Sequence, residues 1–129
     1  MTVRSLHAPL YEVEHMEVNP QGGASVIRLN PQHAVYRGHF PADPITPGAC
    51  LIQIGANLVK DFLPVFLPVT EITNAKFLQI IRPHQYPIRY DWTIRSASAA
   101  EISLQFKVWS DQALAAQFSI VLKNTIQED

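Results

Sequence analysis

The feature that most constrains the fold of this chain is a proline-free apolar run at residues 49–62. Its sequence is ACLIQIGANLVKDF. A helix formed by these residues would have too few polar side chains to expose a large part of its surface to water. Pro47 and Gly48 precede the run and Pro64 follows it, and proline cannot continue a helix interior. We therefore expect a buried helix here, which the remainder of the chain has to cover.

Most of the remaining sequence has the residue pattern of β-strands. Residues 11–18 (YEVEHMEV) alternate for several positions, and residues 24–29 (ASVIRL) resume the strand pattern after the turn signal NPQGG, which predicts a hairpin. Four further strand-like runs are divided by short polar or proline-containing breaks, and their order suggests a meander: residues 71–83, 86–97, 100–110 and 113–123. About six strands and one long helix predict an α+β domain in which a curved antiparallel sheet wraps the helix.

Length and charge narrow the class of protein. A chain of 129 residues fits one domain, residues 1–129, with a single hydrophobic core. With a formal net charge of −1, the chain has no excess of positive charge that would attract nucleic acid or an anionic membrane. Cys50 is the only cysteine, which favours a reducing compartment. Because we find no signal-peptide pattern and no run of about 20 apolar residues, we expect a soluble cytoplasmic protein.

A stiff loop leads into the expected helix. Its prolines at 41, 44 and 47 each hold φ near −65°, so the segment HFPADPITPG can carry His39 at a defined place. An unperturbed imidazole, with a pKa of about 6.5, can act as a base near neutral pH. Gly48 would let a ligand carbonyl approach the unpaired N–H groups of the helix start. The alternative is that proline and glycine only mark a connection and that His39 is an ordinary hydrogen-bonded residue.

Other reactive side chains have no comparable pattern. Cys50 stands among apolar neighbours with no basic residue beside it, as is typical of an unreactive buried thiol. The remaining histidines lack the spacing of metal ligands, so no metal site is expected.

The loop sequence HFPADPITPG is similar to the His-Phe-Pro-x-x-Pro-(Ile/Val)-x-Pro-Gly signature of the 3-hydroxyacyl-acyl-carrier-protein dehydratases. NAKFLQIIRPHQYP also resembles the start of a strand in that family, with His84 and Gln85 in place of its usual Gly-Asp. The resemblance implies the hotdog fold and a site built across a two-fold dimer. It implies that His39 removes the α-proton of a 3-hydroxyacyl thioester, while helix N–H groups at Gly48 stabilise the enolate-like oxygen.

The chain departs from the family at the position expected to hold the acid. The family has Glu or Asp fourteen residues after its histidine, to protonate the departing hydroxyl, and this chain has Gln53. An amide cannot deliver that proton, and general-acid assistance is typically worth about 10²- to 10⁴-fold in rate. Either His39 transfers both protons, or a partner subunit supplies the acid, or the domain binds acyl chains without turning them over. Gln53 and Asn57, one turn apart, could also be a plain polar stripe, although the family usually has Gln where Asn57 stands.

The resemblance also implies the substrate and partners. Candidate substrate-binding residues are Phe40, Ile45, Pro47, Asn57 and Phe77, with Leu51 and Ile54 as further apolar positions that core packing explains as well. Acyl carrier proteins are acidic, so a basic docking rim is expected, for which the candidates are Arg37, Lys76, Arg82 and Arg89. The expected partners are an acyl carrier protein bearing a 3-hydroxyacyl chain and a second hotdog subunit, in a homodimer, a heterodimer or a higher oligomer. Dehydration requires no cofactor.

Three functions remain open at this point. The first is a dehydratase that converts a 3-hydroxyacyl thioester into a trans-2-enoyl thioester in fatty acid or polyketide-type lipid synthesis. The second, suggested by Gln53, is a non-catalytic or heterodimer-dependent subunit that binds acyl carriers. A hotdog thioesterase is less favoured, because those enzymes usually place a carboxylate on or near the central helix.

Overall fold

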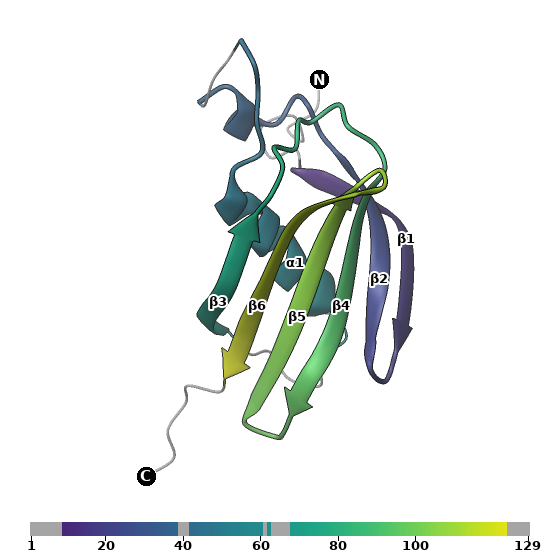
Figure 1. Cartoon of the computed structure of the whole chain (residues 1–129), viewed down its shortest axis with the longest axis vertical. Helices are drawn as coiled ribbons and strands as arrows, with labels where there is room; N and C mark the ends of the chain where they lie inside the picture. Colours follow the sequence, from purple (N-terminus) through teal and green to yellow (C-terminus); the bar gives the residue numbers. More distant parts are fainter. Residues whose placement is uncertain (1–8, 39–41, 61, 63–67, 124–129) are drawn as a thin grey trace, which may run out of the picture.

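The computed structural model describes residues 9–38, 42–60, 62 and 68–123. Six strands and one long helix make up most of this part of the chain (Figure 1). The elements, in chain order, are β1 (Tyr11–Asn19), β2 (Gly22–Leu29), a short 3₁₀ helix (Ala34–Tyr36), α1 (Gly48–Lys60), β3 (Val69–Phe77), β4 (Ile88–Ala97), β5 (Glu101–Ser110) and β6 (Ala113–Lys123).

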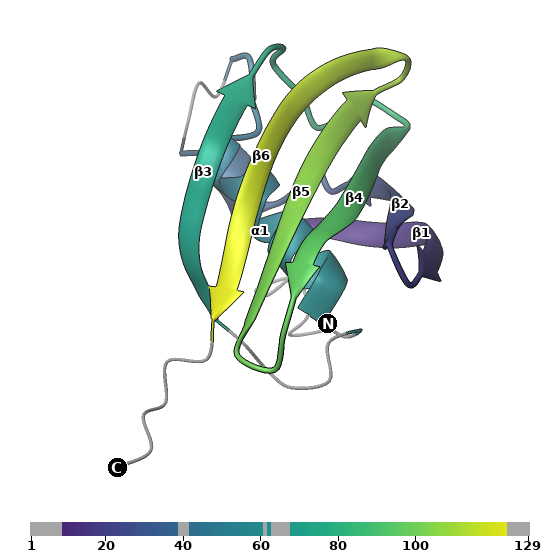
Figure 2. The same ribbon diagram turned by 60° about the horizontal axis from the view of Figure 1, so that its bottom comes forward.

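The six strands form one antiparallel sheet with the order β1-β2-β4-β5-β6-β3. The sheet curves around α1, which lies against one of its faces (Figures 1 and 2). The core consists of the buried face of α1 and the inward side chains of the strands. This arrangement confirms the α+β class and the hotdog fold that the resemblance implied.

The expected hairpin is confirmed and the expected meander is only partly right. Strands β1 and β2 pair from Tyr11 opposite Leu29 to Asn19 opposite Gly22. Strands β4, β5 and β6 follow one another as a meander, but β3 pairs with β6 at the far edge of the sheet and not with β4. The pattern of one strand shows which face is buried, and it does not show which neighbour the strand will have.

The run expected as one strand over residues 71–83 divides into a strand and a crossing segment. Strand β3 ends at Phe77, and the N–H groups of Leu78 and Gln79 both donate to the Ala115 carbonyl, over 2.7 and 3.1 Å. Ile81 is 1% exposed, and its carbonyl accepts a hydrogen bond of 2.8 Å from the Thr46 N–H. The second half of the run therefore packs beneath the residues that lead into α1. After Gln79 it pairs with no strand in the described part of the chain.

Helix α1 begins one residue earlier and ends two residues earlier than the expected range of 49–62. Its first turn closes on the Pro47 carbonyl, which accepts from the N–H groups of Cys50 and Leu51 over 3.0 and 3.2 Å. Phe62 donates to the Val59 carbonyl over 3.0 Å, so the chain leaves the helix through a tighter turn. With 13 residues, α1 is the longest helix described, and no helix in this part of the chain is long and apolar enough to cross a membrane.

A glycine on the buried face of α1 lets the helix approach the sheet closely. The rings of Phe106 and Phe118 are stacked, with their centroids 5.1 Å apart, and both are fully buried. A Cβ added at Gly55 would lie 3.0 Å from the Phe118 ring and 3.2 Å from the Phe106 ring. This contact sets how closely the middle of the helix approaches the strands.

Strand β3 is an edge strand with little cover on either face. It lies at one edge of the sheet, beside β6 (Figure 2). Eight of its nine residues are exposed, and Thr73 is the exception. Among the large apolar side chains near this edge, Ile72 and Phe77 are both 49% exposed, Leu78 is 55% exposed and Ile80 is 51% exposed. An edge strand with exposed apolar side chains is a ready template for pairing with another chain.

Candidate active site

The structure describes both flanks of the signature segment. His39, the expected base, and Phe40, an expected substrate contact, lie outside the described residues, as does Pro41. The roles of His39 and Phe40 therefore stay predictions.

A buried hydrogen bond joins the two flanks of the signature. The hydroxyl groups of Tyr36 and Thr46 are 2.9 Å apart, and both side chains are buried. Burial is the main cause that raises the pKa of Tyr36, and the contact with Thr46 opposes it. Tyr36 precedes position 39 by three residues and Thr46 follows it by seven, so this bond closes the base of the loop that contains His39. Sequence reasoning did not select either residue.

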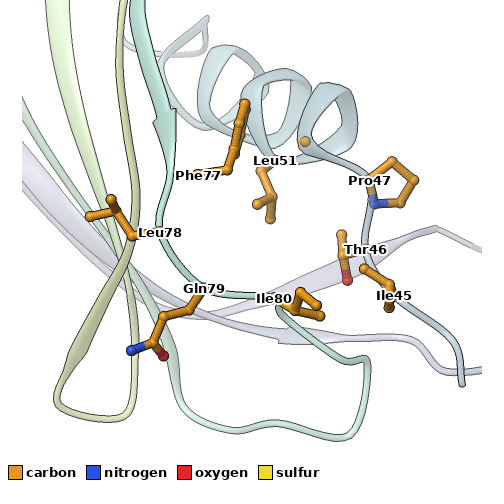
Figure 3. A pocket seen from close by; sticks show the side chains of 9 residues that line it. Ile45, Thr46, Pro47, Leu51, Phe77, Leu78, Gln79 and Ile80 are labelled. Carbon is orange, nitrogen blue, oxygen red and sulfur yellow. The ribbon is translucent and has the colours of Figure 1, made fainter.

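The start of α1 opens onto an apolar cavity of about 420 Å³. Five of the residues that the sequence selected line this cavity, namely Ile45, Pro47, Gly48, Leu51 and Phe77. Its complete lining, shown in Figure 3, is Ile45, Thr46, Pro47, Gly48, Leu51, Phe77, Leu78, Gln79 and Ile80. The residues before α1 lie on one side of the opening, and the residues at and after the end of β3 lie on the other.

Gly48 has a packing role that the sequence did not reveal. A Cβ at this position would lie 2.7 Å from the tip of the Phe77 ring, so the ring rests where a side chain would otherwise be. Within the described part of the chain, the N–H groups of Gly48 and Ala49 donate to no acceptor. The positive end of the helix dipole thus lies beside an apolar cavity, with two N–H groups that bond to no described residue. This arrangement suits an oxygen that carries negative charge.

The predicted amide residues line a different cavity. Gln53 and Asn57 lie along a space of about 500 Å³ with Cys50 and Ile54 from α1. The other side of this space is lined by Pro9, Leu10, Tyr11 and Val13. Within one chain, the structure therefore does not bring Gln53 or Asn57 together with Gly48 and Phe77 in a single cavity.

The two amides are hydrogen-bonded to each other. Gln53 Nε2 donates to Asn57 Oδ1 over 3.0 Å. In this arrangement Gln53 Oε1 remains an acceptor and Asn57 Nδ2 remains a donor, so together they can hold a hydroxyl group. Gln53 is exposed and Asn57 half-buried, and the same bond would exist in a plain polar stripe. Burial raises the pKa of the nearby Cys50 thiol, which agrees with an unreactive cysteine.

Two of the four expected basic docking residues are already paired with acids. Arg82 makes two bonds to Asp43, of 2.7 and 3.0 Å, and Arg89 Nε lies 2.7 Å from Asp91 Oδ1. The Arg82 guanidinium also holds the pKa of Asp43 below its usual value. Arg37 and Lys76 form no ion pair with any residue that the structure describes.

A second feature that sequence reasoning missed ties the helix to the sheet. The hydroxyl of Tyr90, on β4, donates to the Leu51 carbonyl over 2.7 Å, and the side chain is completely buried. Burial raises the pKa of Tyr90 well above its ordinary value. An aromatic residue at an inward strand position was the available signal, but its partner on α1 is 39 residues away in sequence.

The fold is similar to several solved structures. The dehydratase heterocomplex ApeI:P from Xenorhabdus doucetiae matches with a TM-score of 0.76 and 23% identity, over 88% of this chain and 97% of that chain. A hypothetical thioesterase protein with coenzyme A from Streptococcus pneumoniae TIGR4 has a TM-score of 0.65 and 11% identity, over 92% of this chain and 91% of that chain. The TT0310 protein from Thermus thermophilus has a TM-score of 0.64 and 12% identity, over 96% of this chain and 99% of that chain. At these identities the similarities show a shared fold.

Sequence comparison identifies the family. A comparison with curated proteins finds no significant match. The model of the ApeI-like family, described as ApeI dehydratase, matches residues 15–119, which include the whole signature and all of α1. The chain therefore belongs to the ApeI-like dehydratase family.

Proposed function

We propose that this protein is a subunit of a dehydratase that eliminates water from 3-hydroxyacyl groups carried on an acyl carrier protein. The observation that carries the proposal is the signature from His39 to Gly48, which leads into a helix start beside an apolar cavity. The N–H groups of Gly48 and Ala49 at this helix start donate to no described residue. The family membership supports the class of reaction.

The residues of the chain can be assigned to the steps of the elimination. His39 removes the proton on the carbon next to the thioester carbonyl, and the N–H groups of Gly48 and Ala49 stabilise the negative charge that develops on the carbonyl oxygen. The bond between the β-carbon and its hydroxyl then breaks, and the hydroxyl leaves as water after receiving a proton. The product is a trans-2-enoyl thioester, whose acyl chain lies against Ile45 and Phe77 in the 420 Å³ cavity.

The proton for the leaving hydroxyl is assigned to a partner subunit. Gln53 can orient a hydroxyl but cannot protonate it, and within one chain it lines a different cavity from Gly48. A complete site therefore needs the helix of a second hotdog subunit that has a carboxylic acid at this position. The solved ApeI:P structure is a dehydratase heterocomplex, which supports a heterodimer here.

The exposed strand β3 is the edge proposed to pair with that subunit. Its outer edge has no partner strand in the described part of the chain, and Ile72 lies on it 49% exposed. We expect Ile72→Lys to abolish association in sedimentation velocity measurements, because a charge would have to be buried at the seam. Val18→Lys, at a 46% exposed position on β1, is the matched control. Association that survives Ile72→Lys would show that the partner binds elsewhere.

The activity test uses purified protein and 3-hydroxyacyl thioesters of a carrier protein. We expect enoyl absorbance to appear when the chain is mixed with a co-encoded hotdog subunit, and to disappear with His39→Ala in this chain. If no enoyl product forms with or without such a partner, the proposal is wrong. Release of free acid from acyl thioesters would instead indicate a thioesterase.

A second candidate function is favoured by one residue. Because Gln53 replaces the acid, the chain could be a non-catalytic subunit that binds acyl carriers and supports an active partner. In that case His39→Ala would leave the activity of the complex unchanged, whereas the dehydratase proposal requires a loss.

A further inference from the structure

The signature segment is attached to the rest of the molecule by a bidentate ion pair. Arg82 Nε donates to Asp43 Oδ1 over 2.7 Å, and Arg82 Nη2 donates to Asp43 Oδ2 over 3.0 Å. Asp43 belongs to the signature and follows position 39 by four residues, while Arg82 lies 39 residues later in the chain. A two-bond contact between guanidinium and carboxylate fixes direction as well as distance.

The backbone of Arg82 is held in place by two hydrogen bonds to Gln85. Its backbone N–H donates to Gln85 Oε1 over 2.8 Å, and its carbonyl accepts from the Gln85 N–H over 3.1 Å. Gln85 Nε2 in turn donates to the hydroxyl of Ser110, which is 8% exposed at the end of β5. Gln85 is one of the two residues that replace the family's Gly-Asp, so this departure builds a turn that anchors Arg82 to the sheet.

The backbone next to the ion pair is fixed as well. The Thr46 N–H donates to the Ile81 carbonyl over 2.8 Å, and the Thr46 hydroxyl bonds to Tyr36 over 2.9 Å. These contacts hold the end of the signature near α1, and the Asp43 contact holds its middle. Four residues span at most about 14 Å when fully extended, and the prolines on either side of Asp43 remove further freedom. The position of Asp43 therefore limits, through the reach of the chain, how far residue 39 can lie from it.

We propose that Asp43 and Arg82 are positioning residues that hold the signature loop so that His39 reaches the α-carbon of the bound thioester. This inference rests on the proposed function and extends it to two residues that do not touch substrate. Exposed ion pairs usually contribute little to stability, so the expected effect is on catalysis and not on folding. A displacement of about 1 Å in a catalytic group can reduce the rate about 100-fold.

The test is a double-mutant cycle on the active complex, with Asp43→Asn, Arg82→Gln and the two together. We expect each single variant to lower kcat about 10- to 100-fold with KM changed less than about 2-fold, and the double variant to be no worse than either one. Asp43→Glu, which keeps a carboxylate with two oxygens, should restore part of kcat.

The matched control is the Arg28–Glu14 pair, which has the same 2.7 Å contact but joins β2 to β1. We expect Arg28→Gln and Glu14→Gln to leave kcat unchanged. Hydrogen exchange of the amides of residues 42–48 gives a readout that does not depend on catalysis, and exchange should become faster in Asp43→Asn and Arg82→Gln alone.

The outcomes separate this inference from the proposed function. If wild-type complexes are active and the single variants keep full kcat, or their effects simply multiply in the double variant, the positioning role is wrong and the proposed function stands. If KM rises while kcat is kept, Arg82 contacts the carrier protein and the inference is again wrong. If wild-type complexes produce no enoyl thioester at all, the proposed function fails, and the positioning role fails with it.

Discussion

The substitution Gln53→Glu tests directly whether the missing acid limits this chain. Gln53 is exposed, and the only hydrogen bond of its side chain to a described residue is the donation from Nε2 to Asn57 Oδ1. A carboxylate cannot donate, so the Asn57 amide would turn to present its own N–H₂ group. We expect the fold to remain intact, because both groups lie at the border of a cavity and can rearrange.

The expected gain follows from the fraction of the new carboxyl that holds a proton. An exposed glutamate has a pKa of about 4.3, so about 0.2% is protonated at pH 7 and about 6% at pH 5.5. General-acid help of about 10²- to 10⁴-fold, weighted by these fractions, raises the rate about 1.2- to 20-fold at pH 7 and about 7- to 600-fold at pH 5.5. The ratio of variant to wild type therefore increases towards low pH.

The assay is enoyl formation by the homogeneous chain at a series of pH values between 5.5 and 8. Dividing the variant rate by the wild-type rate removes the pH dependence that the two proteins share. Gln112→Glu, which adds the same charge at an exposed position beyond β5, is the control and should give a ratio near one at every pH. A ratio for Gln53→Glu that does not change with pH, or that stays below one, would refute the reasoning.

Three further predictions concern the buried contacts. Tyr36→Phe leaves the buried Thr46 hydroxyl without its partner and should lower the free energy of unfolding, measured in urea, by about 1–3 kcal/mol. Adding Thr46→Val should recover most of this loss. Losses that add up in the double variant would contradict this prediction. Gly55→Ala should lower the free energy of unfolding by about 1 kcal/mol. Crowding of the new methyl group against Phe118 costs about 1–3 kcal/mol, which exceeds the gain of about 1 kcal/mol in helix propensity. An unchanged urea midpoint would show that the ring can move. The folded state raises the pKa of Tyr90, so it holds this proton more firmly than the unfolded state does, and stability should fall by up to about 1.4 kcal/mol per unit above pH 10. The slope should be shallower in Tyr90→Phe, and equal slopes would contradict the assignment.

The local elements were predictable from the sequence because neighbouring residues decide them. Alternating apolar residues and a short turn signal define the first hairpin, and its two strands pair as expected. The proline-free apolar run defines α1 to within two residues at each end. The signature from His39 to Gly48 indicated the family, which the sequence comparison confirms.

The contacts around the candidate site were harder to predict, because they join residues far apart in the chain. The signature showed a stiff loop, but the ion pair between Asp43 and Arg82 and the bond between Tyr36 and Thr46 depend on how the segment after β3 packs beneath it. The glycine at 48 was interpreted as space for a ligand, and the structure places the Phe77 ring against it.

The order of residues was thus enough to establish the secondary structure, the family and the chemical groups that the chain can offer. Folding decided which of those groups meet: β3 leaves the meander for the far edge of the sheet, and Gln53 and Gly48 line separate cavities. The physical reason is that helix and strand patterns depend on backbone geometry and burial within a few residues. The choice of strand neighbour and the side of the helix on which a cavity remains depend on the packing of the whole core.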